Sequence, residues 1–106
     1  MESIDVRTLN EWIIDNNALQ LLDVRESWEF NHCSIGGSIN IPISEIDKRL
    51  NELDHEKNIV VICHHGARSL QAAYYLQNSG FENRIINLEG GIDAWAEHIA
   101  PQMPRY

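Results

Sequence analysis

Short apolar runs alternate with amphipathic stretches along the chain, and this alternation limits the possible fold more than any other feature. Each run is short enough to be a strand, and the stretches between the runs have helical spacing. The runs are LQLLDV (19–24), SINI (38–41), IVVIC (59–63) and RIINL (84–88). Strands that are apolar on both faces and separated by helices are typical of parallel sheets with both faces covered. We therefore predict an α/β fold in three layers, with a central, mostly parallel sheet flanked by helices on both faces.

The first predicted helices have recognisable start signals. Asp5 is placed to cap a helix that runs to about Asn16. The apolar face of this helix contains Leu9, Trp12 and Ile13. Further along, Ser44 with Asp47 resembles a capping box, which predicts a helix that ends near Leu53.

The remaining helices are predicted from their spacing and from glycines at their ends. Residues 26–30 indicate a short helix, and residues 68–80 indicate a longer one that ends at Gly80. The pair Gly90-Gly91 then turns the chain into a last helix. Every predicted strand except the last is thus followed by a helical segment before the next strand begins.

Length and charge narrow the class of protein. The 106 residues suit one domain, since single domains commonly have about 100–150 residues. The net charge of −8 argues against nucleic acids and anionic membranes as partners. No apolar run approaches the roughly 20 residues of a membrane span, and the first residues lack the pattern of an export signal. We therefore expect a cytoplasmic protein that binds neither nucleic acid nor membranes.

The cysteines and histidines do not have the spacing of a metal site. The two cysteines are Cys33 and Cys63, and structural disulfides are rare in the reducing cytoplasm. The five histidines do not combine with them into zinc-finger spacing. We therefore expect no metal and no organic cofactor. Cys33 is either a buried structural residue or a second, resolving thiol.

The segment CHHGARS (63–69) has the parts of an anion site around a thiol. Cys63 lies at the carboxyl end of a predicted strand, where ligands bind in parallel sheets. The next helix would point its free backbone N–H groups and its partial positive charge at this thiol. Gly66 permits the positive φ of a closed loop, Arg68 adds a fixed charge, and Ser69 lies where a helix start favours a hydroxyl. Such a loop favours the thiolate and holds an anion above it.

Five segments of the chain occur in the order expected of one protein family. They are LLDVRESWEF, GGSINIP, VVICHHGARSLQAA, LQNSGF and NLEGGIDAW. In their order and spacing the chain resembles the rhodaneses, single-domain sulfurtransferases. The resemblance implies one rhodanese-like domain over residues 1–106, with a core over about 4–97 and a short C-terminal tail over 98–106. It implies the rhodanese-like three-layer version of the α/β fold predicted above.

The resemblance also implies an activity for Cys63. In this family the cysteine takes a sulfane sulfur from a donor such as thiosulfate, holds it as a persulfide, and passes it to cyanide or a thiol. The active-site loop that binds the donor would be His64, His65, Gly66, Ala67 and Arg68. The alternative is a persulfide carrier or redox-sensing module that serves a protein acceptor and turns over thiosulfate slowly.

The length of the loop separates sulfur transfer from phosphate chemistry. Cysteine phosphatases that share this fold place five residues between cysteine and arginine, which leaves room for a tetrahedral phosphate. Here four residues separate Cys63 from Arg68. The shorter loop suits a single sulfur atom on the cysteine and disfavours an arsenate reductase or a phosphatase.

The other polar residues near the loop each have two interpretations. Arg68 either binds the sulfonate end of the donor or pairs with Asp23 or Glu29 and braces the loop. His64 and His65 either contact the donor anion or are solvated loop residues.

Asp23 and Arg25 follow a strand and lie at the edge of the predicted site. We interpret them as supporting residues, an ion pair that fixes the adjoining loop, rather than as substrate ligands. Ser69 is a further supporting residue at the start of the helix. The sequence does not assign a role to the C-terminal tail.

Overall fold

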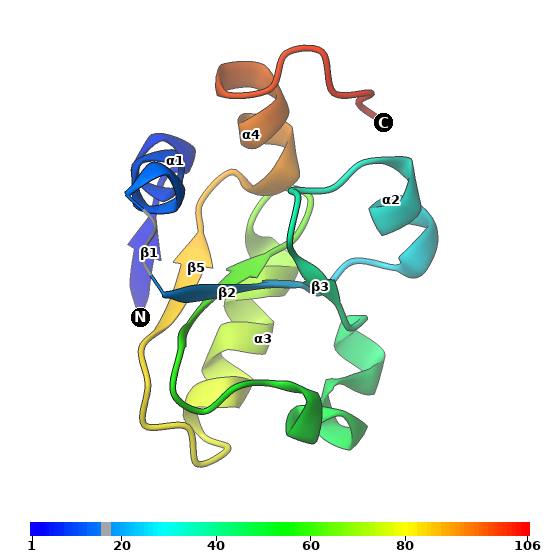
Figure 1. Ribbon diagram of the computed structural model, residues 1–106. Helices are drawn as coiled ribbons and strands as arrows, with labels where there is room; N and C mark the ends of the chain where they lie inside the picture. The colour runs from blue at the N-terminus through cyan, green and yellow to red at the C-terminus, as the bar shows by residue number, and fades with distance from the viewer. Residues whose placement is uncertain (16–17) are drawn as a thin grey trace.

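A parallel sheet runs through the middle of the protein (Figure 1). The computed structural model describes residues 1–15 and 18–106, and within these residues the sheet has five strands. They are β1 (Glu2–Ile4), β2 (Leu19–Asp23), β3 (Ile39–Asn40), β4 (Asn58–Ile62) and β5 (Ile85–Leu88). Their order is β1-β5-β4-β2-β3, and each neighbouring pair is parallel. The predicted α/β class with a central parallel sheet is confirmed.

Helices cover both faces of this sheet, as predicted. In Figure 1, α1 (Val6–Ile14) and α4 (Gly91–His98) lie above the sheet and α3 (Ala67–Gln77) lies below it. The 3₁₀ helices η1 (Ile43–Lys48) and η2 (Leu50–Glu52) lie on the α3 side. The short helix α2 (Ser27–His32) follows the carboxyl end of β2.

Strand β4 shows why the sheet must be covered on both faces. Ile59 and Val61 belong to the core cluster between the sheet and α3, and Val60 and Ile62 belong to the cluster between the sheet and the helices α1 and α4. All four are 0% exposed. Full burial of an aliphatic side chain of this size contributes about 1.5–3 kcal/mol, so both helical layers contribute to stability.

Strand β1 was not expected from the sequence. It pairs with β5, with Glu2 opposite Ile86 and Ile4 opposite Leu88. Only Ile4 of this strand is buried. Three residues with one buried side chain leave no pattern by which a strand can be predicted.

The first helix begins at the predicted residue, but one residue of its predicted apolar face is exposed. The Asp5 side chain accepts a hydrogen bond from the backbone N–H of Thr8 at 2.8 Å, as an N-cap does. Leu9 is buried, whereas Ile13, predicted on the same apolar face, lies on the last turn and is 40% exposed. The helix ends at Ile14. The predicted end at Asn16 lies outside the described residues.

Two predicted helix boundaries are wrong, one at the start of a helix and one at the end of another. Pro42, not Ser44, occupies the N-cap of the segment after β3, and this segment forms the 3₁₀ helices η1 and η2. Its start is fixed from outside, because the N–H of Ile43 donates to the carbonyl of Val24 at 3.0 Å. Helix α3 ends at Gln77, before Gly80, because side chains of the next two residues bond to its last carbonyls. Those bonds are Asn78 Nδ2 to Tyr74 O and Ser79 Oγ to Tyr75 O.

Among the helices of residues 1–15 and 18–106, none is both long enough and apolar enough to span a bilayer.

Candidate active site

The strand connections change direction between β2 and β4. From β2 the chain continues to β3 on one side, and from β4 it continues to β5 on the other side. Neighbouring parallel strands whose connections leave in opposite directions form a topological switch point, where ligands bind at the carboxyl ends. Asp23 at the end of β2 lies opposite Ile62 at the end of β4, so Cys63 follows directly at this point.

The thiol of Cys63 is enclosed by the turn that follows it. Its Sγ accepts a hydrogen bond from the backbone N–H of Gly66 at 3.0 Å and donates one to Ser69 Oγ at 3.3 Å. Cys63 is 1% exposed. Both partners belong to the predicted loop and its support, and the Gly66 N–H would also stabilise a sulfur anion at this position.

Gly66 allows helix α3 to begin immediately beside the thiol. It is the N-cap of α3 with φ of +112°, a conformation that favours glycine. The helix starts at Ala67, and the first N–H groups of any helix lack intrahelical acceptors. These amides carry the positive end of the helix dipole, which favours an anion at Cys63.

The opposite side of the loop is fixed to helix α4. The N–H groups of Ile92 and Asp93 donate to the carbonyls of Cys63 and His64 at 2.9 and 3.0 Å. Gly91 makes this approach possible, since a Cβ on it would lie 2.2 Å from the Cys63 carbonyl oxygen. The loop is therefore held between the starts of two helices, α3 and α4.

Ser69 connects the loop to strand β5. Its hydroxyl, 0% exposed, contacts the Gly66 carbonyl at 3.1 Å and also hydrogen-bonds to Asn87 Oδ1. Asn87 is a polar side chain inside an apolar strand, and the sequence analysis did not single it out. Its presence in the run RIINL was the available signal, because a buried amide requires a partner.

Arg68 pairs with Glu29 on α2. Its Nη1 and Nη2 donate to the two carboxylate oxygens at 2.8 and 2.9 Å, a bidentate fork. The hydrogen bonds from Arg68, supported by Tyr106 and opposed by burial, lower the pKa of Glu29 to about 2. Asp23 and Glu29 were the two carboxylates considered as partners for Arg68, and in the structure the partner is Glu29.

Asp23 forms its ion pair with Arg25 instead. Arg25 Nη2 lies 2.7 Å from Asp23 Oδ2, and both side chains are 0% exposed. The same guanidinium donates to the carbonyl of Cys33 at 2.6 Å and to the Tyr106 hydroxyl at 2.8 Å. These contacts tie the end of β2 to the end of α2, and Cys33 itself is buried beside Arg25 as a free thiol.

The two loop histidines lie face to face at the surface. The rings of His64 and His65 are 4.0 Å apart between centroids at 23°. Burial and the neighbouring His65, against the attraction of carboxylates, lower the pKa of His64. His65 Nε2 is 3.9 Å from Asp93, whose carboxylate also accepts from Arg105 Nη2 at 2.6 Å. Potential metal-ligand atoms of His64, His65 and Asp93 lie within 4.8 Å of one another, although the Arg105 cation occupies the Asp93 carboxylate.

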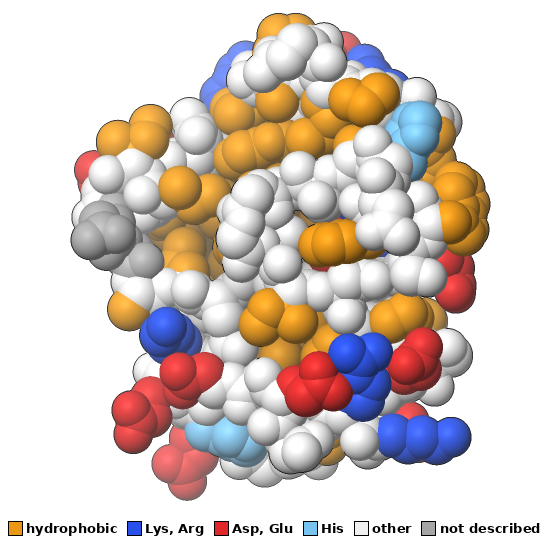
Figure 2. Space-filling view, turned by 45° about the vertical axis from the view of Figure 1, so that its right-hand side comes forward, with side chains coloured by type: hydrophobic (Ala, Val, Ile, Leu, Met, Phe, Trp, Pro, Cys, Tyr) orange, Lys and Arg blue, Asp and Glu red, His pale blue; other side chains and the backbone are white. Residues whose placement is uncertain are grey.

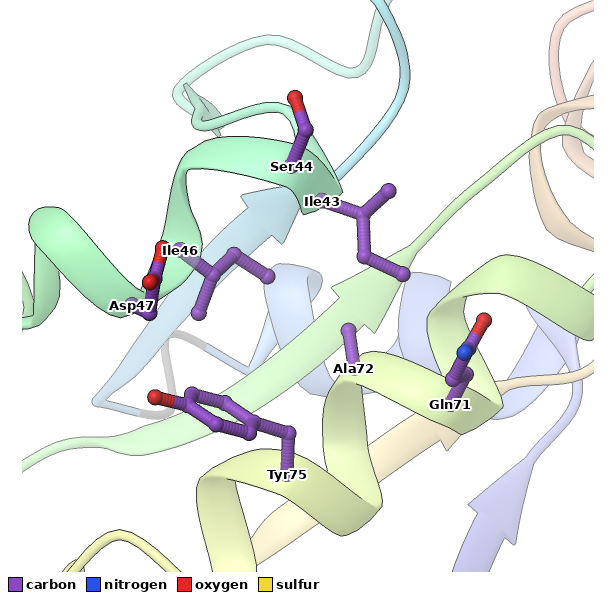
Figure 3. Close-up of a pocket in the computed structure, with 7 residues that line it drawn as sticks. All are labelled: Ile43, Ser44, Ile46, Asp47, Gln71, Ala72 and Tyr75. Carbon is purple, nitrogen blue, oxygen red and sulfur yellow. The ribbon is translucent and has the colours of Figure 1, made fainter.

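A separate surface pocket lies between η1 and α3 (Figure 3). Its volume is about 370 Å³, and Ile43, Ile46, Ala72 and Tyr75 form its apolar wall. Ser44, Asp47 and Gln71 stand at its rim. The residues that line it come from these two helices rather than from the Cys63 loop.

Comparisons with known proteins agree with this geometry. The chain matches the rhodanese-like domain family over residues 4–98. A sulfurtransferase of Allochromatium vinosum is 35% identical over 101 residues, which cover 95% of this chain and 94% of that protein. The thiosulfate sulfurtransferase GlpE of Shewanella oneidensis is 34% identical over 80 residues, 76% of this chain and 78% of that protein. The crystal structure of SSP1007 from Staphylococcus saprophyticus has a TM-score of 0.84 at 35% identity and covers 93% of this chain and 97% of that one.

Fold and site together define a parallel α/β domain that holds a single thiol at a helix N-terminus. The family match covers nearly the whole chain and includes Cys63 and its loop. The chain belongs to the family of rhodanese-like domains, and the resemblance found in the sequence is confirmed.

Proposed function

We propose that this protein is a sulfurtransferase that moves a sulfane sulfur from thiosulfate, or a related donor, to a thiol or cyanide through a persulfide on Cys63. The observation that carries the proposal is the Cys63 Sγ, which lies 3.0 Å from the Gly66 N–H at the start of α3 within a C-x4-R loop. The similarity to proteins named sulfurtransferases supports the general activity. The similarity to a protein named thiosulfate sulfurtransferase supports the donor.

The reaction has two transfers. In the first, the Cys63 thiolate attacks the sulfane sulfur of thiosulfate, a sulfur–sulfur bond forms to Sγ, and the bond to the sulfonate sulfur breaks. Sulfite leaves with that electron pair. In the second, cyanide or a thiolate attacks the outer sulfur, giving thiocyanate or a new persulfide, and the Cys63 thiolate is restored. Covalent catalysis in this order gives ping-pong kinetics.

The loop residues would hold the donor during the first transfer. The N–H of Gly66 points at the reacting sulfur, and the N–H of Ala67 follows it at the start of α3, where helix termini bind anions. A guanidinium has five N–H donors, of which Arg68 uses two for Glu29. Its side chain is 37% exposed, so the remaining donors are available to the sulfonate while the brace stays in place. His64 and His65 belong to the same loop.

The persulfide itself provides the test. Reduced protein incubated with thiosulfate should gain the mass of one sulfur atom on the peptide that contains Cys63, and cyanide should remove it. Cys63→Ser should show neither the mass gain nor turnover, because serine oxygen cannot form a persulfide, whereas Cys33→Ser should keep both.

The alternatives make different predictions in the same experiment. A carrier fed by a protein partner would have a reactive Cys63 that gains no sulfur from thiosulfate. A phosphatase or an arsenate reductase would turn over phosphate esters or arsenate without persulfide formation. We place the reaction in the cytoplasm, where cysteines such as Cys33 and Cys63 stay reduced.

A further inference from the structure

The C-terminal tail forms a strap, residues 99–106, that returns to the active-site loop. Its first part is fixed to the body of the protein, because the N–H groups of Ile99 and Ala100 both donate to the Trp95 carbonyl at 2.9 Å. Ala100 and Met103 then pack against the core beneath α1 and α4. Figure 1 shows the strap leaving α4 and ending beside α2. Figure 2 shows hydrophobic side chains gathered over the upper part of the molecule, where α4 and the strap lie.

Tyr106 is bound in a slot made by the active-site residues and their braces. Its hydroxyl donates to Glu29 Oε2 at 2.7 Å and accepts from Arg25 Nη1 at 2.8 Å. Its ring stacks on His64, with centroids 4.1 Å apart at 22°. The ring also makes edge contacts at 5.6 Å with Trp28 and His32.

The charge state of Tyr106 suits this position. Burial, together with the neighbouring Glu29 carboxylate and against Arg25, raises the pKa of Tyr106 to about 12. The hydroxyl therefore keeps its proton at any working pH and can donate to Glu29 while it accepts from Arg25. Both bonds involve a charged partner, the stronger class of hydrogen bond.

Arg105 fastens the strap at a second point. Its guanidinium bonds to Asp93 Oδ1 at 2.6 Å, and the backbone N–H of Asp93 holds the carbonyl of His64. The strap thus contacts His64 directly through the Tyr106 ring and is linked to its carbonyl indirectly through Arg105 and Asp93.

Tyr106 lies against His64, the residue that follows Cys63, so its position bears on access to the thiol. Cys63 is 1% exposed, and a donor anion must reach its Sγ. The Arg68–Glu29 and Arg25–Asp23 pairs do not need to break for the last two residues of the strap, Arg105 and Tyr106, to leave, since each pair keeps its own bidentate or buried contacts. Only the contacts of Tyr106 and Arg105 are exchanged for solvent.

We propose that Tyr106 is a gate residue: while it is stacked on His64 and bonded to Glu29 and Arg25 it restricts entry to Cys63, and its release opens the thiol to donors and acceptors. Its importance for sulfur transfer rests on the proposed function. Entry to the thiol can nevertheless be measured without sulfur transfer, so the two proposals can fail separately.

The test is the rate at which iodoacetamide and the bulkier N-ethylmaleimide alkylate Cys63 in the full chain, followed by peptide mass spectrometry. Tyr106→Ala should raise the Cys63 rate by about tenfold or more, because two charge-assisted hydrogen bonds and an aromatic stack are lost. Tyr106→Phe, which keeps the stack, should give a smaller increase. The increase should be larger for the maleimide than for iodoacetamide.

Cys33 and Tyr74 provide the controls. Cys33 is a second buried thiol near the site, so a general loosening of the fold would accelerate its alkylation together with that of Cys63. Tyr74 is an exposed tyrosine on α3, and Tyr74→Ala should leave both rates unchanged. Equal Cys63 rates in Tyr106→Ala and the wild type, or parallel acceleration of both cysteines, would overturn the gate. If Tyr106→Ala does not fold, Tyr106→Phe and Arg105→Gln decide the question by the same criteria.

Discussion

Replacing Glu29 by glutamine removes the charge that braces Arg68 and preserves the shape of the side chain. The pKa of Glu29 falls from its usual 4.5 to about 2, chiefly through the Arg68 fork. At about 1.4 kcal/mol per pH unit, this difference corresponds to about 3 kcal/mol of folding free energy. The Arg68 side chain is 37% exposed, and solvent screening reduces the expected value to about 2 kcal/mol.

The pH dependence of this contribution has a definite sign. A carboxyl whose pKa is lower in the folded protein stabilises the fold fully above its unfolded pKa of about 4.5. The contribution is lost as the pH falls toward the folded pKa of about 2. Glu29→Gln should therefore be less stable than the wild type by about 2 kcal/mol at pH 7, and the difference should shrink between pH 5 and pH 2.

Urea unfolding at a series of pH values measures this difference directly. The matched control is Glu82→Gln, at an exposed glutamate, which should change stability by less than about 0.5 kcal/mol at every pH. Other carboxylates titrate in the same range, but they are common to both proteins and cancel in the comparison. A Glu29→Gln deficit that stayed constant from pH 7 to pH 2.5 would show that the charge of Glu29 does not contribute, and would refute the brace.

Two further predictions concern the loop. Gly91→Ala should lower the free energy of unfolding by about 3 kcal/mol in urea titrations, because its Cβ would lie 2.2 Å from the Cys63 carbonyl oxygen at a φ of +55°. The control Gly37→Ala shares a positive φ but has nothing within 4 Å, so a loss of about 1 kcal/mol is expected there. Equal losses would mean that the close approach of α4 is unimportant. Inserting one residue between His65 and Gly66 should lower thiosulfate turnover and admit phosphate-sized anions, whereas unchanged thiosulfate kinetics would show that loop length does not set selectivity.

The parts of the fold that the sequence predicted are those with many buried residues in a short run. The strand predicted at 59–63 has four fully buried aliphatic residues. Their side chains point alternately into the two apolar layers on either face of the sheet. Strand β1, with one buried residue, left no comparable pattern. The helix prediction for the segment after Pro42 was also wrong. The start of this segment depends on a backbone hydrogen bond from Ile43 to Val24, and Val24 lies outside the segment.

The same distinction separates the predictable from the unpredictable parts of the site. Cys63, Gly66 and Ser69 are neighbours in sequence, and their contacts follow from one strand, one turn and one helix. Local spacing in the sequence could therefore indicate the anion site around the Cys63 thiol. Tyr106 reaches Arg25 across 81 positions of sequence, and no local pattern marks such a contact.

The charges around the loop explain how an acidic protein can offer a site to an anion. The chain has a net charge of −8, yet three carboxylates near the loop are each paired with an arginine. The pairs are Asp23 with Arg25, Glu29 with Arg68 and Asp93 with Arg105. Three of the eight basic residues are thus used at this one edge of the sheet. Because these three pairs cancel locally, the N-terminal amides of α3 remain the main uncompensated dipole at Cys63, and that dipole favours a persulfide anion or an approaching donor anion in the same place.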